Sequence, residues 1–147
     1  MKNIRTIFLL WILMAIGCGL PARAQIASIL GMWKTVDDKT GEVRALVDIY
    51  QDVDGLYYGK IEKMFRYTDA VCDKCEGDDK GRPLQGLIII RGMKAYKDIL
   101  KDGYVLDPET GKQYHAIIRF NPKTGKLQLR GSLDRSGLLG RNQYWIR

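Results

Sequence analysis

The sequence predicts an all-β domain, an eight-stranded antiparallel up-and-down barrel, and three observations favour this class. Turn signals recur at short, nearly regular intervals from residue 29 onward, and the segments between them alternate apolar and polar residues. Turns at this density with alternating flanks are typical of antiparallel strands joined by hairpins. The 147 residues, of which 46% are hydrophobic and 28% charged, suffice for one ordinary globular domain. A barrel leaves no open sheet edge, and a β-sandwich is the alternative.

The first 24 residues have the pattern of a cleaved export signal, followed by a single domain over residues 25–147. Lys2 and Arg5 give a positive start, an apolar run follows, and small residues precede the cleavage position after Ala24. Cleavage between Ala24 and Gln25 would remove three basic residues and no acidic one, so the formal charge would fall from +7 to +4. We therefore expect a mildly basic domain that is exported to the periplasm or secreted.

Cys18 supports a second interpretation of this leader. A cysteine near the end of such a run is the attachment residue of a lipoprotein, and a lipid anchor at Cys18 would hold the domain at a membrane. Bacterial lipoprotein signals usually carry Leu three positions before the cysteine, where this chain has Ala15. The apolar run is shorter than the ~20 residues of a membrane span, so a transmembrane segment is not expected.

Each expected strand lies between two turn signals. Three turns share one pattern, in which Asp or Asn opens the turn and Gly closes it with a positive φ, and they cover residues 37–41, 107–111 and 121–125. In the second strand the odd-numbered residues from 43 to 49 are all apolar, as one buried face requires. The expected strands cover residues 31–36, 43–51, 56–65, 84–92, 103–107, 113–120, 126–133 and 139–146. The one helix expected in the domain is a short stretch over residues 94–100, with a simple turn as the alternative.

The two ends of the domain carry a pattern that suits barrel closure. Gly31 and Trp33 open the first strand, and the last strand carries Arg141 and Arg147. This arrangement resembles the lipocalin pattern, in which a Gly-x-Trp of the first strand is covered by a basic side chain of the last. An arginine stacks well on an indole face, a contact worth on the order of 1 kcal/mol. We expect Gly31, Trp33 and one of the two arginines to have a structural role.

A set of motifs in a fixed order is similar to a known bacterial family. In chain order they are GMWK at 31–34, CDKC at 72–75, PLQGL at 83–87, VLDPETGK at 105–112, LQLRG at 127–131 and LGRNQYW at 139–145. Together they resemble the exported proteins called domain of unknown function 2147. The resemblance implies a β-rich, lipocalin-like domain, and it transfers no activity, cofactor or catalytic residue.

Cys72 and Cys75 are the only cysteines outside the leader, and we expect a disulfide between them in an exported protein. Because the bond would close so short a loop, it would gain little closure entropy and would brace a loop at the barrel mouth without holding the fold together. Zinc is an alternative, although two thiolates need two further ligands from the neighbouring acids or His115. A redox centre is less favoured because nearby glycines and a proline indicate a loop, and a calcium site lacks its regular ligand spacing.

No catalytic constellation is visible in the sequence. His115 is the sole histidine and lies in an expected strand without a nucleophile or an acid beside it, so we expect an ordinary surface or core residue. We therefore expect no enzyme activity, no metal and no cofactor. Nucleic acid is not expected as a partner, because the domain is expected to be exported and carries no recognised motif.

Basic residues gather toward the end of the chain. Residues 110–147 carry eight Lys and Arg side chains against the single acid Asp134. Such a cluster is usually a solvated face, and it also suits an anionic partner such as an anionic membrane surface or an envelope polymer.

The favoured function is binding without catalysis. An eight-stranded barrel is either filled by side chains or holds one small ligand. Residues whose types suit a small hydrophobic or amphiphilic ligand with a negative head are Trp33, Tyr50, Tyr58, Arg91, Arg119 and Tyr144. The alternative is a protein–protein interaction module of the cell envelope, and an enzyme is the less favoured alternative. A pocket with apolar walls would favour the ligand, whereas a filled interior with an exposed apolar patch would favour the partner.

Overall fold

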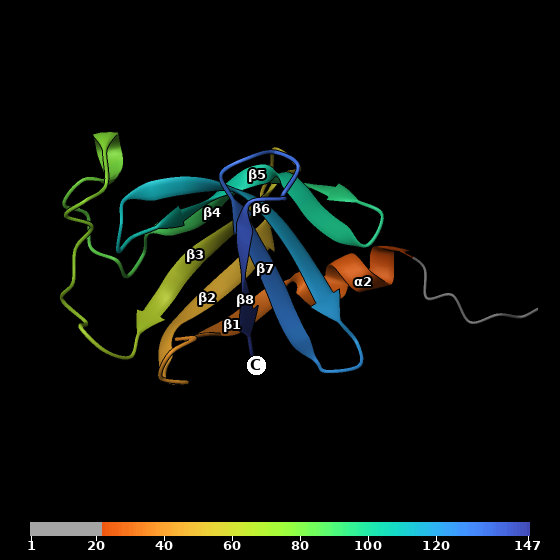
Figure 1. Cartoon of the computed structure of the whole chain (residues 1–147), viewed down its shortest axis with the longest axis horizontal. Coiled ribbons are helices and arrows are strands. Elements are labelled where there is room, and N and C mark those ends of the chain that lie inside the picture. Colours follow the sequence, from red (N-terminus) through yellow and green to blue (C-terminus); the bar gives the residue numbers. More distant parts are fainter. Residues whose placement is uncertain (1–21) are drawn as a thin grey trace, which may run out of the picture.

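The computed structural model describes residues 22–147, which form one eight-stranded sheet and a short N-terminal helix (Figure 1). The strands are β1 (Gly31–Val36), β2 (Val43–Gln51), β3 (Tyr57–Met64), β4 (Ile88–Tyr96), β5 (Ile99–Asp107), β6 (Lys112–Asn121), β7 (Lys126–Ser132) and β8 (Gly140–Trp145). Helix α2 (Ala22–Ile29) precedes β1, and a 3-10 turn, η1 (Gly77–Asp79), lies between β3 and β4. Each strand pairs antiparallel with the next strand in sequence.

The sheet curls until its first and last strands meet. The backbone N–H of Lys34 donates to the carbonyl of Ile146 at 2.7 Å, and the N–H of Ile146 donates to the carbonyl of Lys34 at 3.0 Å. These bonds join β1 to the end of β8 and leave a nearly closed barrel. The up-and-down barrel expected from the sequence is confirmed, and the β-sandwich is excluded.

The helix expected over residues 94–100 is wrong, because this segment forms the β4–β5 hairpin. Lys94 pairs with Lys101 and Tyr96 with Ile99, while Lys97 takes a positive φ of 55° in the turn. Tyr96 and Ile99 favour strands, and the intervening Lys-Asp pair is long enough for a two-residue turn. As a result β4 ends later, and β5 begins earlier, than the sequence predicts.

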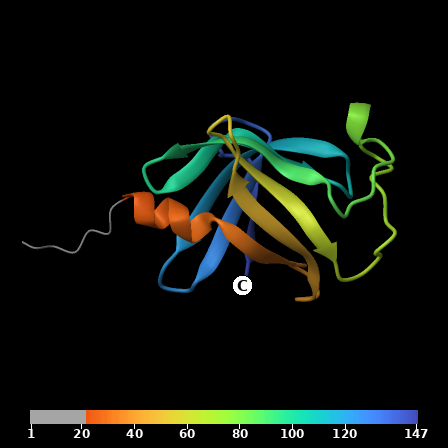
Figure 2. The same cartoon turned by 180° about the vertical axis from the view of Figure 1, so that it is seen from behind.

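Helix α2 was not expected, and Figure 2 shows that it leads directly into β1. Ile26 and Ile29 are buried where α2 packs on β5 and β6. Residues 1–21, with most of the expected leader and Cys18, lie outside the described residues. The expected cleavage position between Ala24 and Gln25 falls inside α2, and both buried isoleucines follow it. No helix within residues 22–147 is long and apolar enough to cross a membrane.

Side chains from all eight strands fill the barrel. The buried inward-facing residues include Trp33, Ile49, Ile61, Ile90, Leu100, Ile118, Leu127 and Trp145. Most of them have no solvent-accessible surface at all, so no cavity large enough for a water molecule borders on them. At this level the interior is a packed core, which is one of the two states that the sequence leaves open for a barrel of this size.

Candidate functional site

The end of the barrel beside α2 is closed by Trp33 and Arg147. The indole N–H of Trp33 donates to the carbonyl of Ile29 at 2.7 Å, and the ring has 0% exposed surface. The Arg147 guanidinium carbon lies 4.4 Å from the centroid of this ring. Gly31 has a φ of +97°, a conformation that suits glycine and turns the chain from the helix into the strand. Arg141, the other basic residue expected here, instead forms an ion pair with the β1–β2 turn.

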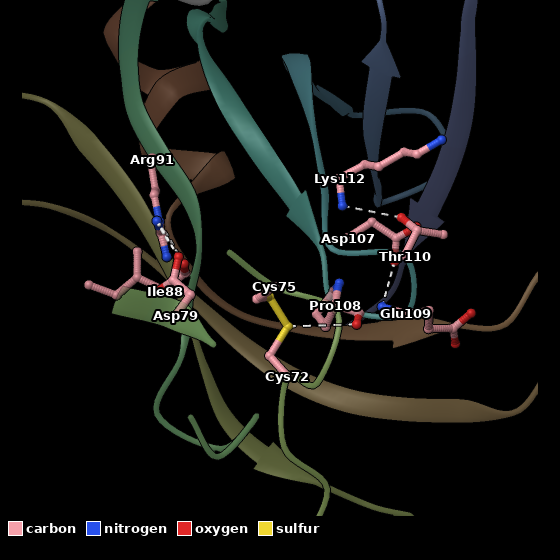
Figure 3. The surroundings of a disulfide bond; sticks show 10 residues. All are labelled: Cys72, Cys75, Asp79, Ile88, Arg91, Asp107, Pro108, Glu109, Thr110 and Lys112. Atoms are coloured by element: carbon pink, nitrogen blue, oxygen red, sulfur yellow. Dashed lines mark hydrogen bonds and ion pairs between the residues drawn. A yellow bond between two sulfur atoms is a disulfide. The ribbon is translucent and has the colours of Figure 1, made fainter. Parts of the chain in front are cut away.

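The disulfide between Cys72 and Cys75 lies in the long loop between β3 and β4 (Figure 3). Both cysteines are buried, with Cα atoms 5.3 Å apart. The Cys72 sulfur lies 3.7 Å from the Pro108 carbonyl oxygen, and this is a van der Waals contact because a disulfide sulfur has no hydrogen to donate. A side chain at Gly111 would overlap the carbonyl of Lys74, so the loop packs tightly against the β5–β6 turn. The disulfide therefore braces a loop against the barrel.

Arg91, one of the expected ligand-binding residues, has a structural partner in the same loop. Its guanidinium lies 2.8 Å from the carboxylate of Asp79 and donates through Nε to the carbonyl of Ile88 (Figure 3). The hydrogen bond from Arg91 lowers the pKa of Asp79 below its usual value, against the opposing effect of burial. The pair fixes η1 to β4, and Arg91 serves the fold at this point.

The other expected ligand-binding residues do not share a pocket. Trp33 is part of the core, whereas the other four lie on the outer face of the barrel. Tyr50 and Tyr58 pair across β2 and β3 with ring centroids 6.2 Å apart. Arg119 and Tyr144 lie on β6 and β8, on either side of β7. The structure therefore does not gather the six residues into one site.

A groove of about 470 Å³ lies on the outer face of β4, β5, β6 and β7. The side chains that define its chemistry are Lys94, Lys101, Tyr104, His115, Ile117 and Arg135. Tyr104 and His115 are cross-strand partners, and their ring centroids lie 4.9 Å apart. The groove thus combines an aromatic wall, an apolar side chain and three cations.

The charge of this groove is mainly positive. Lys94 lies directly opposite Lys101 in the β4–β5 ladder, and like charges in this position destabilise a sheet. Within residues 22–147, no carboxylate forms an ion pair with Lys94, Lys101 or Arg135. The Lys101 ammonium lies 3.9 Å from the Tyr96 ring centroid, and Asp102 is the single acid of the lining. Two cross-strand lysines therefore line the groove with no carboxylate partner within residues 22–147.

Two irregularities in the strands shape the groove. The β5–β6 register shifts between Leu100 and Gly103, and Asp102 within the shift takes a φ of +61°. A Cβ atom at Gly103 would lie 2.5 Å from the backbone oxygen of Arg91 and 2.7 Å from the backbone nitrogen of Met93, so β4 and β5 approach too closely there for any larger residue. Bulges of this kind bend a strand and often lie beside functional sites.

The Ser132 hydroxyl of the groove lining bonds to the backbone. The Ser132 hydroxyl donates to the backbone carbonyl of Asp134 at 2.8 Å and, more weakly, to the backbone carbonyl of His115 at 3.5 Å. It does not donate to the imidazole, so a serine–histidine pair is not assembled. In the part of the chain that the structure describes, no three His, Cys, Asp or Glu residues lie close enough to hold a metal ion.

Sequence analysis missed most of this groove. Lys94 and Lys101 lie in or beside a segment that was expected to be helical, and His115 was expected to be an ordinary strand residue. The signal that could have found the groove is the strand alternation that places Tyr104 opposite His115, but using it requires the β5–β6 register. That register depends on the shift before Gly103.

The closed barrel and the Trp33–Arg147 contact define a lipocalin-like protein. Among solved structures, the chain is similar to Protein HP1028 from the human pathogen Helicobacter pylori, which belongs to the lipocalin family. The two share 19% identity with a TM-score of 0.69, over 81% of this chain and 82% of that chain, and at this identity the likeness shows the fold alone. The profile of the family "Uncharacterized protein conserved in bacteria (DUF2147)" matches residues 31–147, and the chain belongs to this family. This confirms the resemblance seen in the sequence motifs. No curated protein matches the chain.

Proposed function

We propose that this protein is a non-catalytic binding protein that holds a small anionic ligand in the outer groove across β4 to β7. The observation that carries the proposal is the pair of facing lysines, Lys94 and Lys101, which lack a carboxylate partner and lie in the same groove as Arg135. A phosphate or carboxylate between them would relieve their repulsion and gain charge-assisted hydrogen bonds.

The remaining groove walls suit a ligand that joins its anionic group to an apolar or ring-shaped part. The Tyr104 and His115 rings and the Ile117 side chain offer such a part a surface to pack on. This is the amphiphilic, negatively headed ligand class expected from the sequence, at a different place on the barrel. The packed core argues against the interior as its site, because the buried side chains there border no free volume.

We further propose that the domain is exported. The leader pattern supports this, and so does the disulfide of Cys72 and Cys75, because such bonds persist in oxidising compartments. Cleavage before Gln25 would retain both buried isoleucines of α2.

The test of the binding proposal is a two-dimensional NMR titration of the purified protein with phenyl phosphate. We expect the largest shift changes at the amides of Lys94, Lys101, Tyr104 and His115. The neutral analogue benzyl alcohol should give much weaker changes, because the cations then have no counter-charge to bind. Substituting Lys94→Gln together with Lys101→Gln should reduce the affinity for phenyl phosphate at least about tenfold, since each lost charge-assisted bond is worth about 1.5–3 kcal/mol.

The matched control is Lys123→Gln with Lys126→Gln, which removes the same two charges from the β6–β7 turn and the adjoining end of β7, away from the groove lining. This variant should bind phenyl phosphate as the parent does. An equal loss of affinity in both variants would show that net charge alone attracts the anion. Shift changes confined to inward-facing residues would instead place the ligand inside the barrel and refute the proposed site.

A further inference from the structure

Three exposed leucines stand on the loop between β7 and β8. Leu133, Leu138 and Leu139 have 70%, 81% and 70% of their surface exposed. Single exposed leucines are ordinary on a protein surface, but three on one short loop form an apolar patch, which usually marks an interaction site.

Polar contacts hold this loop in place while its leucines stay in solvent. The Asp134 carboxylate accepts hydrogen bonds from the backbone N–H groups of Leu138 at 3.2 Å and Leu139 at 2.9 Å. Arg130 donates through Nε to the Gly137 carbonyl at 2.6 Å and through Nη2 to the Leu138 carbonyl at 3.2 Å. The loop is thus ordered from within, and the leucines are presented without contributing to its order.

The loop that carries the leucines borders the basic groove. Arg135, in the middle of the loop, lines the groove. A Cβ atom at Gly137 would lie 3.5 Å from the Cδ1 atom of Ile117, the apolar side chain of the groove wall. Figure 1 shows the loop arching beside β5 and β6, the strands that form the groove floor. An exposed apolar loop therefore adjoins a groove whose cations form no ion pair within residues 22–147.

We propose that this face docks on an anionic lipid bilayer, with the three leucines entering the boundary of the acyl chains and the groove holding a lipid phosphate. The inference rests on the proposed function and names the ligand class of that same groove. Apolar side chains flanked by cations are the combination that binds anionic membrane surfaces. The filled interior and the exposed leucines also meet the condition stated above for a protein partner. The neighbouring cations favour an anionic lipid surface over such a partner, and leucine is under-represented among the residues that dominate protein interfaces.

The test is co-sedimentation of the purified protein with vesicles. We expect binding to vesicles of phosphatidylcholine mixed with phosphatidylglycerol, weak binding to phosphatidylcholine alone, and weaker binding as salt is raised. The triple variant Leu133→Ser, Leu138→Ser, Leu139→Ser should lose at least about tenfold in vesicle affinity, since each leucine contributes apolar burial. The matched control, Val53→Ser with Tyr67→Ser, alters exposed apolar residues on other loops and should bind vesicles as the parent does.

Phenyl phosphate separates this inference from the proposed function. The leucine variant should keep its phenyl phosphate shifts and lose the vesicles, whereas Lys94→Gln with Lys101→Gln should lose both. Parent protein that binds phenyl phosphate and ignores the mixed vesicles would overturn the membrane proposal alone. A leucine variant that sediments like the parent, or equal binding to both vesicle types, would also overturn it. Vesicle binding that is unchanged by the two lysine substitutions would refute the part of the proposal in which the groove holds the lipid phosphate.

Discussion

Replacing Trp33 with alanine tests whether the indole closes the barrel. The ring has no exposed surface, and it lies between the core and the Arg147 guanidinium. Arg147 also donates to the carbonyls of Ser28 at 3.0 Å and Leu30 at 2.9 Å, so it ties the end of α2 to the ring. Removing the indole therefore opens a cavity in the core. It also leaves the Ile29 carbonyl without its donor and removes the ring on which the Arg147 guanidinium packs.

These contributions set the expected magnitude. Truncation of a fully buried Trp to Ala costs about 3–5 kcal/mol of unfolding free energy, including the cavity. The cation–π contact accounts for about 0.5–1 kcal/mol of this, because Arg147 is on the exposed side. Trp33→Phe keeps a ring beneath the guanidinium but leaves the Ile29 carbonyl without its donor, and it should cost about 1–3 kcal/mol.

Urea unfolding of the parent, both Trp33 variants, Arg147→Ala and the double variant Trp33→Ala with Arg147→Ala measures these terms. The double-mutant cycle should give a coupling of about 0.5–1 kcal/mol between the two residues. If Trp33→Ala unfolds within about 1 kcal/mol of the parent, the side chain does not close the barrel and the reasoning is refuted. A coupling of zero would mean that Trp33 stabilises the core without a contribution from its contact with Arg147.

Three further outcomes follow from the structure. The double variant Cys72→Ser with Cys75→Ser should stay folded and loosen only the β3–β4 loop, as hydrogen exchange would show; global unfolding would contradict this. The hydrogen bond from the Ser136 hydroxyl, followed by that from the Leu139 amide, lowers the pKa of Asp134 from 3.8 to about 2. The order that these bonds give to the β7–β8 loop should therefore be complete above pH 3.8 and be lost as the pH falls through about 2. The amide chemical shifts of the loop measure this loss. Sequencing of the exported protein should find Gln25 at its amino terminus, and a lipid-modified Cys18 would refute the expected cleavage.

The barrel could be predicted because its turns are encoded locally. The Asn121 side chain accepts the backbone N–H of Lys123 at 3.0 Å, and the Asp107 carboxylate accepts that of Glu109 at 3.0 Å, as the sequence pattern predicts. The β4–β5 turn lacks such a residue at its opening position, Tyr96, so the sequence does not predict this hairpin. Helix α2 is not predicted because its first three residues belong to the expected leader, and the remaining five, Gln25–Ile29, are too few to show a helical pattern.

The groove could not be predicted because outward-facing residues of a sheet give no local signal. Lys94, Tyr104 and Arg135 lie far apart in sequence, and only the pairing of four strands brings them together. The expected ligand residues were chosen by type, and type does not say which way a side chain points. Tyr50 and Tyr58 show this, since both are aromatic and both lie on the outer face, away from the core.

A packed barrel with its candidate site on the outside separates two demands that a hollow lipocalin must meet with the same residues. Alternation along each strand assigns the inward positions to stability and the outward ones to recognition. Under the proposed function, substitutions at outward positions such as Lys94 or Tyr104 would alter ligand choice without opening a cavity in the core. A library randomised at these outward positions should therefore retain folded members at high frequency.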